Sequence, residues 1–355
     1  MRIAVLGVGL IGGSIGLAAR KQIEDVEVIG FGRSRERLER AMELGAIDRA
    51  SDSLEWALDG ASACFACGPV GALPDQVAAA LAAAPDDCVV TDVGSTKQRL
   101  VDSVDDERFI GGHPVAGAET SGVDHARADL FQGAVWYLTP LERSSGLLYE
   151  RLHRIVVSLG ARPVAIDAST HDRLLATVSH LPHVLANVLV SQAARELARG
   201  DEPLPRAGPS FRDATRVAGA SSAVWRDIYL ANSEAIADEI DETVSRLGEV
   251  SAALRSGDGE AIVAWNERAA DDRRRLLEAD LAGGAVHELR LTVPNRPGIV
   301  AQVALALGKA DVNIVDMALA PAADMRSGAM TLWIAGDDQA ARATELIDEL
   351  GFPVG

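Results

Sequence analysis

A short apolar segment that runs directly into a glycine-rich turn constrains the fold of this chain more than any other feature. Residues 2–6 are mostly apolar and predict a buried strand, and residues 7–12 match the pattern GxGxxG. In this pattern Gly7 permits a tight turn, Gly9 lets the backbone approach a pyrophosphate, and Gly12 lets the next helix pack closely on the strand. Strand, turn and helix in succession predict a domain that binds a dinucleotide.

The helix after the turn points its first N–H groups and the positive end of its dipole toward the phosphates of a bound dinucleotide. A glycine-rich turn without a ligand is the alternative, but the complete strand-turn-helix context favours a nicotinamide dinucleotide. The predicted cofactor-binding residues of this segment are Gly7, Gly9, Leu10, Ile11 and Gly12.

The residues after the second predicted strand bear on which dinucleotide binds. A domain that binds NAD carries a carboxylate there, ~20 residues past the motif, but in this chain Gly32 occupies that place. The donors of Arg33, Ser34 and Arg35 suit the 2′-phosphate of NADP better than a pair of hydroxyls. The sequence therefore favours NADP over NAD. In the alternative, Arg35 is a solvated helix residue and Glu36 binds the ribose.

The length of the chain limits the number of domains, and its net charge limits the classes of function. At 355 residues the chain is too long for one ordinary core, which predicts two or three domains. Its net charge of −18 would repel a polyanion and argues against nucleic-acid binding. No apolar run is expected to span a bilayer, and the N-terminus is a core strand instead of a signal segment. We therefore predict a cytoplasmic enzyme without a nucleic-acid or membrane partner.

The cysteines do not indicate redox chemistry. Cys64 and Cys67 form a CxxC pattern inside a predicted buried strand. Residues three apart in a strand point to opposite faces, whereas the redox motif needs a helix N-terminus to lower the pKa of a thiol. Cys88 precedes another apolar strand and is predicted to lie in the core.

Alternating strand and helix patterns cover the first ~165 residues and predict a doubly wound α/β domain of the Rossmann type. We assign this domain to residues 1–168, with helices at 35–44 and 73–83. The predicted strands are 3–6, 26–31, 63–66, 89–93, 109–111, 135–138 and 162–166.

An all-helical domain is predicted for residues 169–282, which show helical periodicity without strand signals. A loop rich in proline and glycine interrupts it at 199–209. Its apolar stripes exceed what one short bundle needs, which predicts a homodimer interface. After two glycines, residues 285–355 follow the order β-α-β-β-α-β of a ferredoxin-like α+β domain.

Two polar residues after predicted strands are candidates for catalysis, because ligands bind at the carboxyl ends of strands in an open α/β sheet. His113 lies in a turn of glycines and proline and can accept a hydroxyl proton as hydride leaves the same carbon. Ser95 follows the strand before it. The alternatives are a turn histidine bonded to backbone and a serine that caps a helix.

His180 and His183 lie three residues apart and share one face of a helix, which Asn187 extends. Two histidines at this spacing suit a metal, but no cysteine or carboxylate cluster completes a site nearby and hydride transfer needs no metal. We therefore predict no metal at this pair of histidines. Pro182 is expected to start or kink the helix.

A polar cluster follows in the helical domain. Arg216 is the candidate for binding a carboxylate through two hydrogen bonds, with Asp213 orienting it. The alternative is a surface ion pair with little effect on stability. Trp225 is either a core residue or a wall of the substrate pocket.

These motifs together resemble the prephenate dehydrogenases of tyrosine biosynthesis, in the form that carries a C-terminal ACT domain. The resemblance rests on residues 10–18 with the preceding glycines, 92–97, 111–122, 179–183 and 211–216, and the turn at 293–298 looks like the start of an ACT module.

The resemblance implies roles for individual residues. His113 would take the proton of the ring hydroxyl of prephenate as hydride passes to the nicotinamide, and Ser95 would support that hydroxyl or His113. Arg216 would bind a substrate carboxylate, with His183 and Glu119 lining the pocket, and His180 is also assigned to substrate binding. Loss of carbon dioxide would then make the ring aromatic and give 4-hydroxyphenylpyruvate.

In the ACT-like module, backbone N–H groups around Gly298 and the side chain of Asn313 are predicted to bind an effector. The resemblance implies tyrosine or a related aromatic amino acid. The alternative is a module that only stabilises or dimerises the protein.

Three rival functions are weighed against this one. An arogenate dehydrogenase would use Glu119 near the substrate amine, and the preference for NADP favours it. A hydroxyacid dehydrogenase would need a catalytic lysine in the helical domain, but residues 171–282 contain no lysine. A non-catalytic sensor of nucleotide and amino acid would have no use for both His113 and Arg216.

Overall fold

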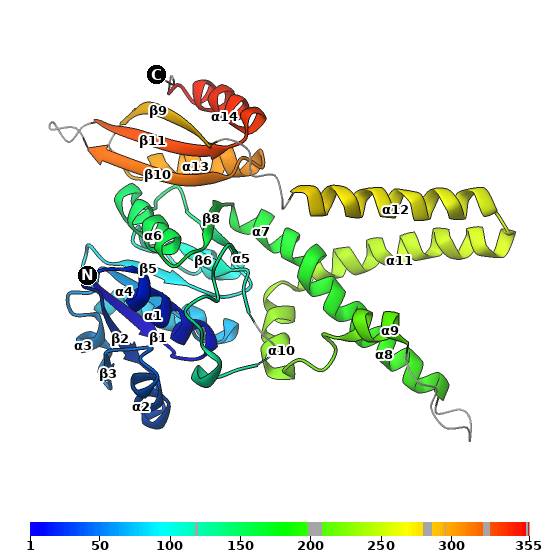
Figure 1. Ribbon diagram of the computed structural model, residues 1–355, viewed down its shortest axis with the longest axis horizontal. Coiled ribbons are helices and arrows are strands. Elements are labelled where there is room, and N and C mark those ends of the chain that lie inside the picture. The colour runs from blue at the N-terminus through cyan, green and yellow to red at the C-terminus, as the bar shows by residue number, and fades with distance from the viewer. Residues whose placement is uncertain are drawn as a thin grey trace. The chain divides into compact units, whose positions relative to one another are not determined.

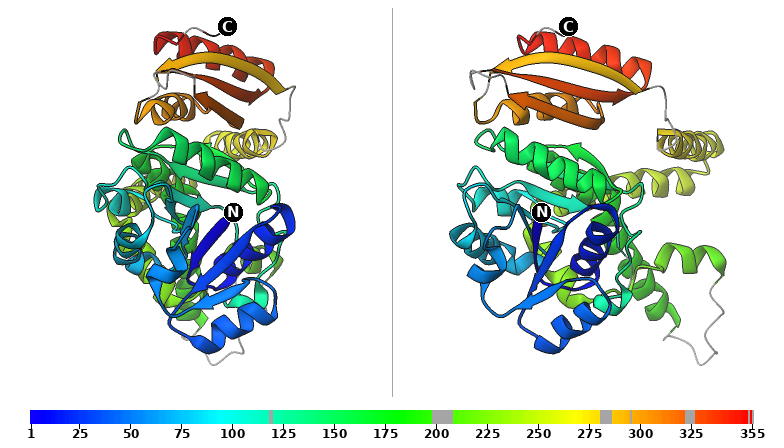
Figure 2. Two further views of the ribbon diagram at one scale, coloured as in Figure 1. Left: turned by 90° about the vertical axis from the view of Figure 1, so that its left-hand side faces the viewer. Right: turned by 60° about the vertical axis from the view of Figure 1, so that its left-hand side comes forward.

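The computed structural model describes residues 1–117, 120–197, 208–279, 286–294, 296–321, 327–352 and 354 (Figures 1 and 2). Its contacts divide the chain into two compact units: Met1–His171 with Ala285–Gly355, and Asp172–Gly284. The first unit thus contains both the nucleotide-binding domain and the C-terminal module, which the sequence predicts as separate domains. The glycines predicted to separate the second and third domains lie outside the described residues.

The nucleotide-binding domain has the predicted parallel sheet. Its strand order is β3-β2-β1-β4-β5, and nearly every residue of β1, β4 and β5 is buried, as expected for strands covered on both faces. The strands are β1 (Arg2–Leu6), β2 (Glu27–Phe31), β3 (Arg49–Ser51), β4 (Ala63–Ala66) and β5 (Val89–Asp92). The helices are α1 (Leu10–Gln22), α2 (Arg35–Glu43), α3 (Leu54–Leu58), α4 (Leu73–Ala83) and α5 (Gln98–Asp102).

A second sheet continues the first. A parallel bridge between Val90 and Phe109 leads into β6 (Gly111–Pro114), β7 (Val135–Thr139) and β8 (Arg162–Ala165), in the order β6-β7-β8. The predicted strand at 109–111 was placed too early, because the glycines and proline around His113 were interpreted as a turn. The very short β3 was missed because three residues carry no alternating pattern.

Glycines let α1 lie directly against its neighbours. A Cβ on Gly12 would stand 2.3 Å from the carbonyl oxygen of Gly7, and one on Gly16 would stand 1.8 Å from that of Ala46. No larger residue fits at either position, so this helix and the turn before it are held at close range to the sheet.

Cys64 and Cys88 are buried as predicted, whereas Cys67 is half-buried and follows the end of β4. Cys64 lies in β4, and burial raises the pKa of its thiol and of the Cys67 thiol. Burial raises the pKa of Cys88 to about 12. Redox chemistry requires the thiolate, which this environment disfavours.

The second unit is helical, as predicted. Its elements are α7 (Ala168–Leu175), which begins in the first unit, η3 (Ala176–His180), α8 (Leu181–Leu197), α9 (Pro209–Thr215), α10 (Ser222–Ala231), α11 (Ser233–Ser256) and α12 (Gly259–Ala279). The segment η3 is a π-helix, in which the Leu181 N–H donates to the carbonyl of Ala176 five residues earlier. Pro182 follows at once and has no N–H to donate, which favours such a widened turn.

One helical stretch differs from the expectation about membranes. Among the described residues, Ala168–Arg195 is long and apolar enough to cross a bilayer by length and composition alone, and 28% of its most apolar window is buried. Length and apolar composition are weak evidence for a membrane span, because the core helices of soluble proteins share both properties. The same stretch carries the buried polar side chains of His180 and His183.

The C-terminal module has the sheet order of the predicted ferredoxin-like plan. Its strands pair antiparallel in the order β10-β11-β9, and Val354 adds a single bridge to Leu291 beside β9 where a full last strand would lie. The elements are β9 (Val286–Pro294), α13 (Ile299–Lys309), β10 (Ile314–Pro321), β11 (Ser327–Ala335) and α14 (Asp337–Glu349).

Two glycines of the module touch the backbone of the nucleotide-binding domain. A Cβ on Gly308 in α13 would stand 1.8 Å from the carbonyl oxygen of Ala165 in β8, and one on Gly298 would stand 2.0 Å from that of Glu142. Figures 1 and 2 show α6 (Gly146–Ser158) between the module and the sheet of β6–β8, and its contacts agree. One continuous apolar core therefore covers both parts.

The close approach at Gly308 predicts an unusual response to alanine. In most helices Gly→Ala stabilises by ~0.5–1 kcal/mol, and we expect this for Gly248→Ala in α11, whose Cβ meets nothing within 4 Å. Gly308→Ala should instead destabilise by ~1–3 kcal/mol through overpacking. Urea unfolding of both variants measures the difference. Equal stabilisation by both substitutions would show that α13 does not depend on this contact.

Candidate active site

The glycine-rich turn forms an open cradle that fits a dinucleotide. Gly7 has φ +99°, a Cβ on Gly9 would meet nothing within 4 Å, and α1 has no side-chain cap over its first amides. The backbone between Gly9 and Gly12 is thus accessible to an anion at a helix N-terminus. Leu10 and Ile11, which are predicted to bind the cofactor, form the first turn of α1.

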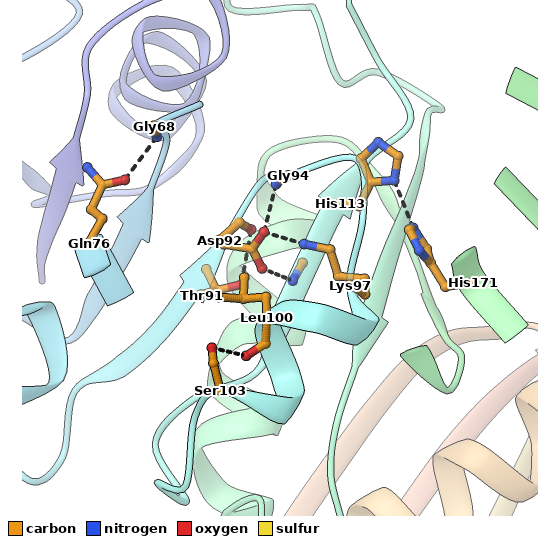
Figure 3. Close-up of polar contacts among 11 residues, drawn as sticks. Gly68, Gln76, Thr91, Asp92, Gly94, Lys97, Leu100, Ser103, His113 and His171 are labelled. Carbon is orange, nitrogen blue, oxygen red and sulfur yellow. Dashed lines mark hydrogen bonds and ion pairs between the residues drawn. The ribbon is translucent and has the colours of Figure 1, made fainter. Parts of the chain in front are cut away.

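A glutamine that the sequence analysis did not single out fixes the rim of this cradle. The Gln76 amide on α4 donates to the carbonyl of Leu6 at 3.0 Å and accepts from the Gly68 N–H at 3.0 Å, and Figure 3 shows the second bond. These bonds tie the loop after β4 to the end of β1. Nothing in the local pattern of α4 indicates this role, because Leu6 lies 70 residues away in the sequence and Gly68 lies outside the helix.

A cavity of about 550 Å³ lies at the ends of β2 and β3, where a dinucleotide presents its ribose. Gly32, Arg33 and Arg35 line it. The Arg35 guanidinium donates to Glu39 at 2.8 Å, and Ser34 caps α2 by accepting from the Arg37 N–H. None of the ion pairs between described residues includes Arg33, whereas Arg35 is paired with Glu39.

A fully buried carboxylate organises the strand ends next to the cradle (Figure 3). Asp92, at the end of β5, accepts from the Gly94 N–H at 2.7 Å and from the Gly112 N–H at 3.0 Å, and forms an ion pair with Lys97. Both charged side chains are 0% exposed. One carboxylate therefore holds the residues next to Ser95 and to His113.

Ser95 lies in the loop that this carboxylate holds. The helix α5 begins at Gln98 with Lys97 at the cap position, so Ser95 does not cap it and that alternative is excluded. Ser95 is half-buried and follows the carboxyl end of β5, at the same edge of the parallel sheet as the glycine-rich turn after β1.

His113 lies inside β6 and not in the expected turn. It is 7% exposed, and its register partner on β7 is Tyr137. Its Nδ1 lies 2.9 Å from Nε2 of His171, and the two rings cross at 75° (Figure 3). Sequence reasoning missed His171, because a single histidine at the start of a helical segment carries no motif of its own.

A second cluster forms in the helical unit. His183 is buried and stacks on Trp225, with ring centroids 3.6 Å apart and planes at 4°. Its Nδ1 contacts the Tyr229 hydroxyl and lies 3.2 Å from the amide nitrogen of Asn187. Burial lowers the pKa of His183, so its ring is neutral near pH 7. Its buried Nε2 has no hydrogen-bond partner within the described parts of the chain.

His180 completes this cluster from the π-helix. Its ring is buried and meets Trp225 edge-on at 6.0 Å, and its Nδ1 lies 3.2 Å from the side-chain nitrogen of Asn232. Asn232 also donates to the carbonyl of Asp172 at 2.7 Å. The described residues contain no group of three or more His, Cys, Asp or Glu side chains placed to hold a metal.

The other predicted site residues are distributed differently. Asp213 in α9 and Arg216 at its end are exposed, and Glu119 lies outside the described residues. The prediction for Gly298 needs correction, because its N–H donates to the carbonyl of Ser144 at 3.0 Å and is not available to an effector. Asn313 has a buried Oδ1 without a hydrogen-bond partner among the described residues.

Comparison with known proteins identifies the family. The model for prephenate dehydrogenase, nucleotide-binding domain, matches residues 15–165, and that for prephenate dehydrogenase, dimerization domain, matches 167–267. A prephenate dehydrogenase of Bacillus subtilis is 32% identical over 98% of this chain and 95% of that protein. A cyclohexadienyl dehydrogenase of Zymomonas mobilis is 32% identical over 74% of this chain and 91% of that protein.

Solved structures agree. The prephenate dehydrogenase from A. aeolicus in complex with hydroxyphenyl propionate and NAD+ aligns with a TM-score of 0.72 and 27% identity over 78% of this chain and 98% of that chain. The Synechocystis arogenate dehydrogenase aligns with a TM-score of 0.68 and 26% identity over 78% of this chain and 100% of that chain. The chain, with its glycine-rich cradle, its buried histidine in β6 and its helical unit, belongs to the prephenate dehydrogenase family.

Proposed function

We propose that this protein catalyses the oxidative decarboxylation of prephenate to 4-hydroxyphenylpyruvate, with hydride transfer to a nicotinamide dinucleotide, in tyrosine biosynthesis. The observation that carries the proposal is the shared carboxylate of Asp92, which holds the loop of Ser95 and the strand of His113 together at the edge of the nucleotide-binding sheet. The family of the chain supports the same activity.

His113 acts as the base in this mechanism. Its Nε2 takes the proton of the ring hydroxyl, the C–H bond of the same carbon gives up a hydride, and a carbonyl forms there. The bound nicotinamide supplies the hydride acceptor. The C–CO₂ bond of the ring then breaks, its electron pair makes the ring aromatic, and His113 returns its proton to the phenolic oxygen. A base of this kind contributes roughly 10²–10⁴ in rate.

The residues around His113 support this step. Ser95 hydrogen-bonds the reacting hydroxyl or His113 itself, and the low exposure of His113 keeps bulk water away from the transferred proton. Asp92 holds the backbone on both sides, so that neither group must reorganise as charge develops.

The cluster in the helical unit binds the substrate. Asn187 donates to Nδ1 of His183, so the proton of this neutral ring stands on Nε2, the nitrogen that we assign to a substrate oxygen. Trp225 forms a wall against which His183 is held flat, with His180 at its edge. Arg216 binds a carboxylate of the substrate and is oriented by Asp213, and Glu119 is assigned a contact with the same substrate.

The proposal extends to the cofactor, assembly and regulation. NADP is the preferred cofactor through Arg33. The protein works in the cytoplasm as a homodimer that associates through its helical domain. Its three domains are residues 1–168, 169–282 and 285–355. Exposed apolar side chains support this dimer: Val188, Leu189, Val190, Val244, Leu247, Leu254, Val263 and Trp265. The C-terminal module is an ACT domain that binds an aromatic amino acid through Asn313.

Replacing the base tests the activity. We expect His113→Asn to lower kcat by roughly 10²–10⁴ with prephenate while KM changes little, because asparagine cannot take the proton. His287→Asn in the C-terminal module is the control and should behave as wild type. Formation of reduced nicotinamide is measured with prephenate and with arogenate. Turnover of arogenate alone would replace the proposed substrate, and unchanged kcat in His113→Asn would reject the base.

The cofactor preference is tested at the ribose cavity. Arg33→Ala should raise KM for NADP by about tenfold or more, because a charge-assisted bond to the 2′-phosphate is lost, and should leave KM for NAD nearly unchanged. Arg35→Ala should have a smaller effect, since Glu39 already engages that guanidinium. Arg37→Ala on the same helix serves as the control. Equal changes for NADP and NAD would contradict the preference.

Regulation is tested with free amino acids. Saturating tyrosine should lower the rate and raise the Tm by binding the folded module, and Asn313→Ala should abolish both effects without changing the rate in the absence of tyrosine. Glycine at the same concentration controls for ionic effects. If neither tyrosine nor phenylalanine shifts the rate or the Tm, the module is not an effector domain for aromatic amino acids.

A further inference from the structure

The hydrogen bond between two buried imidazoles limits the protonation states that the candidate base can adopt. Nδ1 of His113 and Nε2 of His171 are 2.9 Å apart, and the side chains are 7% and 0% exposed. Each neutral imidazole carries one N–H and one lone pair, so one of these two nitrogens donates and the other accepts. Two imidazolium rings cannot make this bond, because both facing nitrogens would then carry protons.

The surrounding structure holds His171 in place independently of any ligand. Asp167 caps the first turn of α7 by accepting from the Thr170 N–H at 2.9 Å, and its backbone carbonyl accepts from the His171 N–H at 2.9 Å. The ring of Tyr137 meets that of His171 edge-on, with centroids 5.4 Å apart at 82°. Tyr137 is also the register partner of His113, so β6, β7 and α7 together determine where the two imidazoles meet.

Only one direction of this bond leaves His113 able to act as a base. If His171 donated from Nε2, His113 would carry its own proton on Nε2, and that nitrogen would have no lone pair for a hydroxyl proton. If His113 donates from Nδ1, its Nε2 keeps a lone pair. The bond then persists after His113 takes the proton, because the imidazolium still donates from Nδ1.

We propose that His171 is a positioning residue that accepts a hydrogen bond at Nε2 from Nδ1–H of His113 and thereby holds His113 in the tautomer competent for proton abstraction. The inference rests on the proposed role of His113. It assigns to a neutral imidazole the task that a carboxylate performs behind the histidine of a serine protease, where loss of the correct tautomer costs roughly 10⁴ in kcat.

Two nearly isosteric substitutions separate hydrogen bonding from packing. The side-chain amide of His171→Gln can accept the bond near the position of Nε2, whereas the thioether of His171→Met fills similar space and is only a weak acceptor. We expect His171→Met to lower kcat by about 10²-fold or more with KM for both substrates changed less than threefold. His171→Gln should stay within about tenfold of wild type.

A buried histidine elsewhere in the same unit supplies the control. His153 on α6 is buried, and His153→Met should keep kcat within threefold of wild type even where its Tm falls. If His171→Met keeps kcat within threefold, or if His171→Gln loses as much kcat as His171→Met, the proposal is wrong. His113→Asn separates this failure from that of the proposed function, because its kcat depends on the base alone.

The tautomer can also be observed without any loss of stability. Nitrogen NMR of the wild-type protein with labelled histidines distinguishes Nδ1–H from Nε2–H, and seven histidines make assignment through single substitutions practical. We expect His113 to carry its proton on Nδ1 in the neutral form. A proton on Nε2 of neutral His113 would overturn the proposal regardless of how the variants behave.

Discussion

The candidate catalytic end of the protein depends on the buried carboxylate of Asp92. A charge removed from water is costly unless an opposite charge and hydrogen bonds replace the lost hydration. Lys97 supplies the charge, and the N–H groups of Gly94 and Gly112 supply the hydrogen bonds. Because one donor lies in the loop after β5 and the other in β6, satisfying one carboxylate also determines how the loop of Ser95 and the strand of His113 lie together.

The C-terminal module packs directly on the nucleotide-binding domain, although the two are far apart in the sequence. Gly308 and Gly298 let the module touch the backbone of β8 and of the loop before α6, and an apolar core runs through both parts. The strand β8 leads directly into α7, which carries His171. The module therefore packs against the strand that leads into α7, the helix whose His171 contacts the candidate base. The same interface includes the hydrogen bond from the Gly298 N–H to the carbonyl of Ser144.

A π-helical turn in the helical unit precedes the cluster of His183 and Trp225. The widened turn of η3 lies just before Pro182, in the helical stretch that carries both His180 and His183. The ring of His183 stacks on Trp225, and that of His180 meets it in a T-shaped contact. Polar side chains from α8 and α10 satisfy Nδ1 of His183, whereas its buried Nε2 has no hydrogen-bond partner within the described residues. The exposed apolar residues of the same unit suit a dimerization domain.

The amino-acid sequence by itself determined the features that depend on short-range pattern: the GxGxxG cradle, the alternation of strands and helices, the helical character of the second unit and the order of elements in the C-terminal module. Only the tertiary structure decided which side chains meet. The partner of His113 lies 58 residues away, and that of Gln76 lies 70 residues away. Periodicity reports which face of an element is apolar, whereas the identity of a buried polar partner follows from packing between elements, which no local pattern encodes.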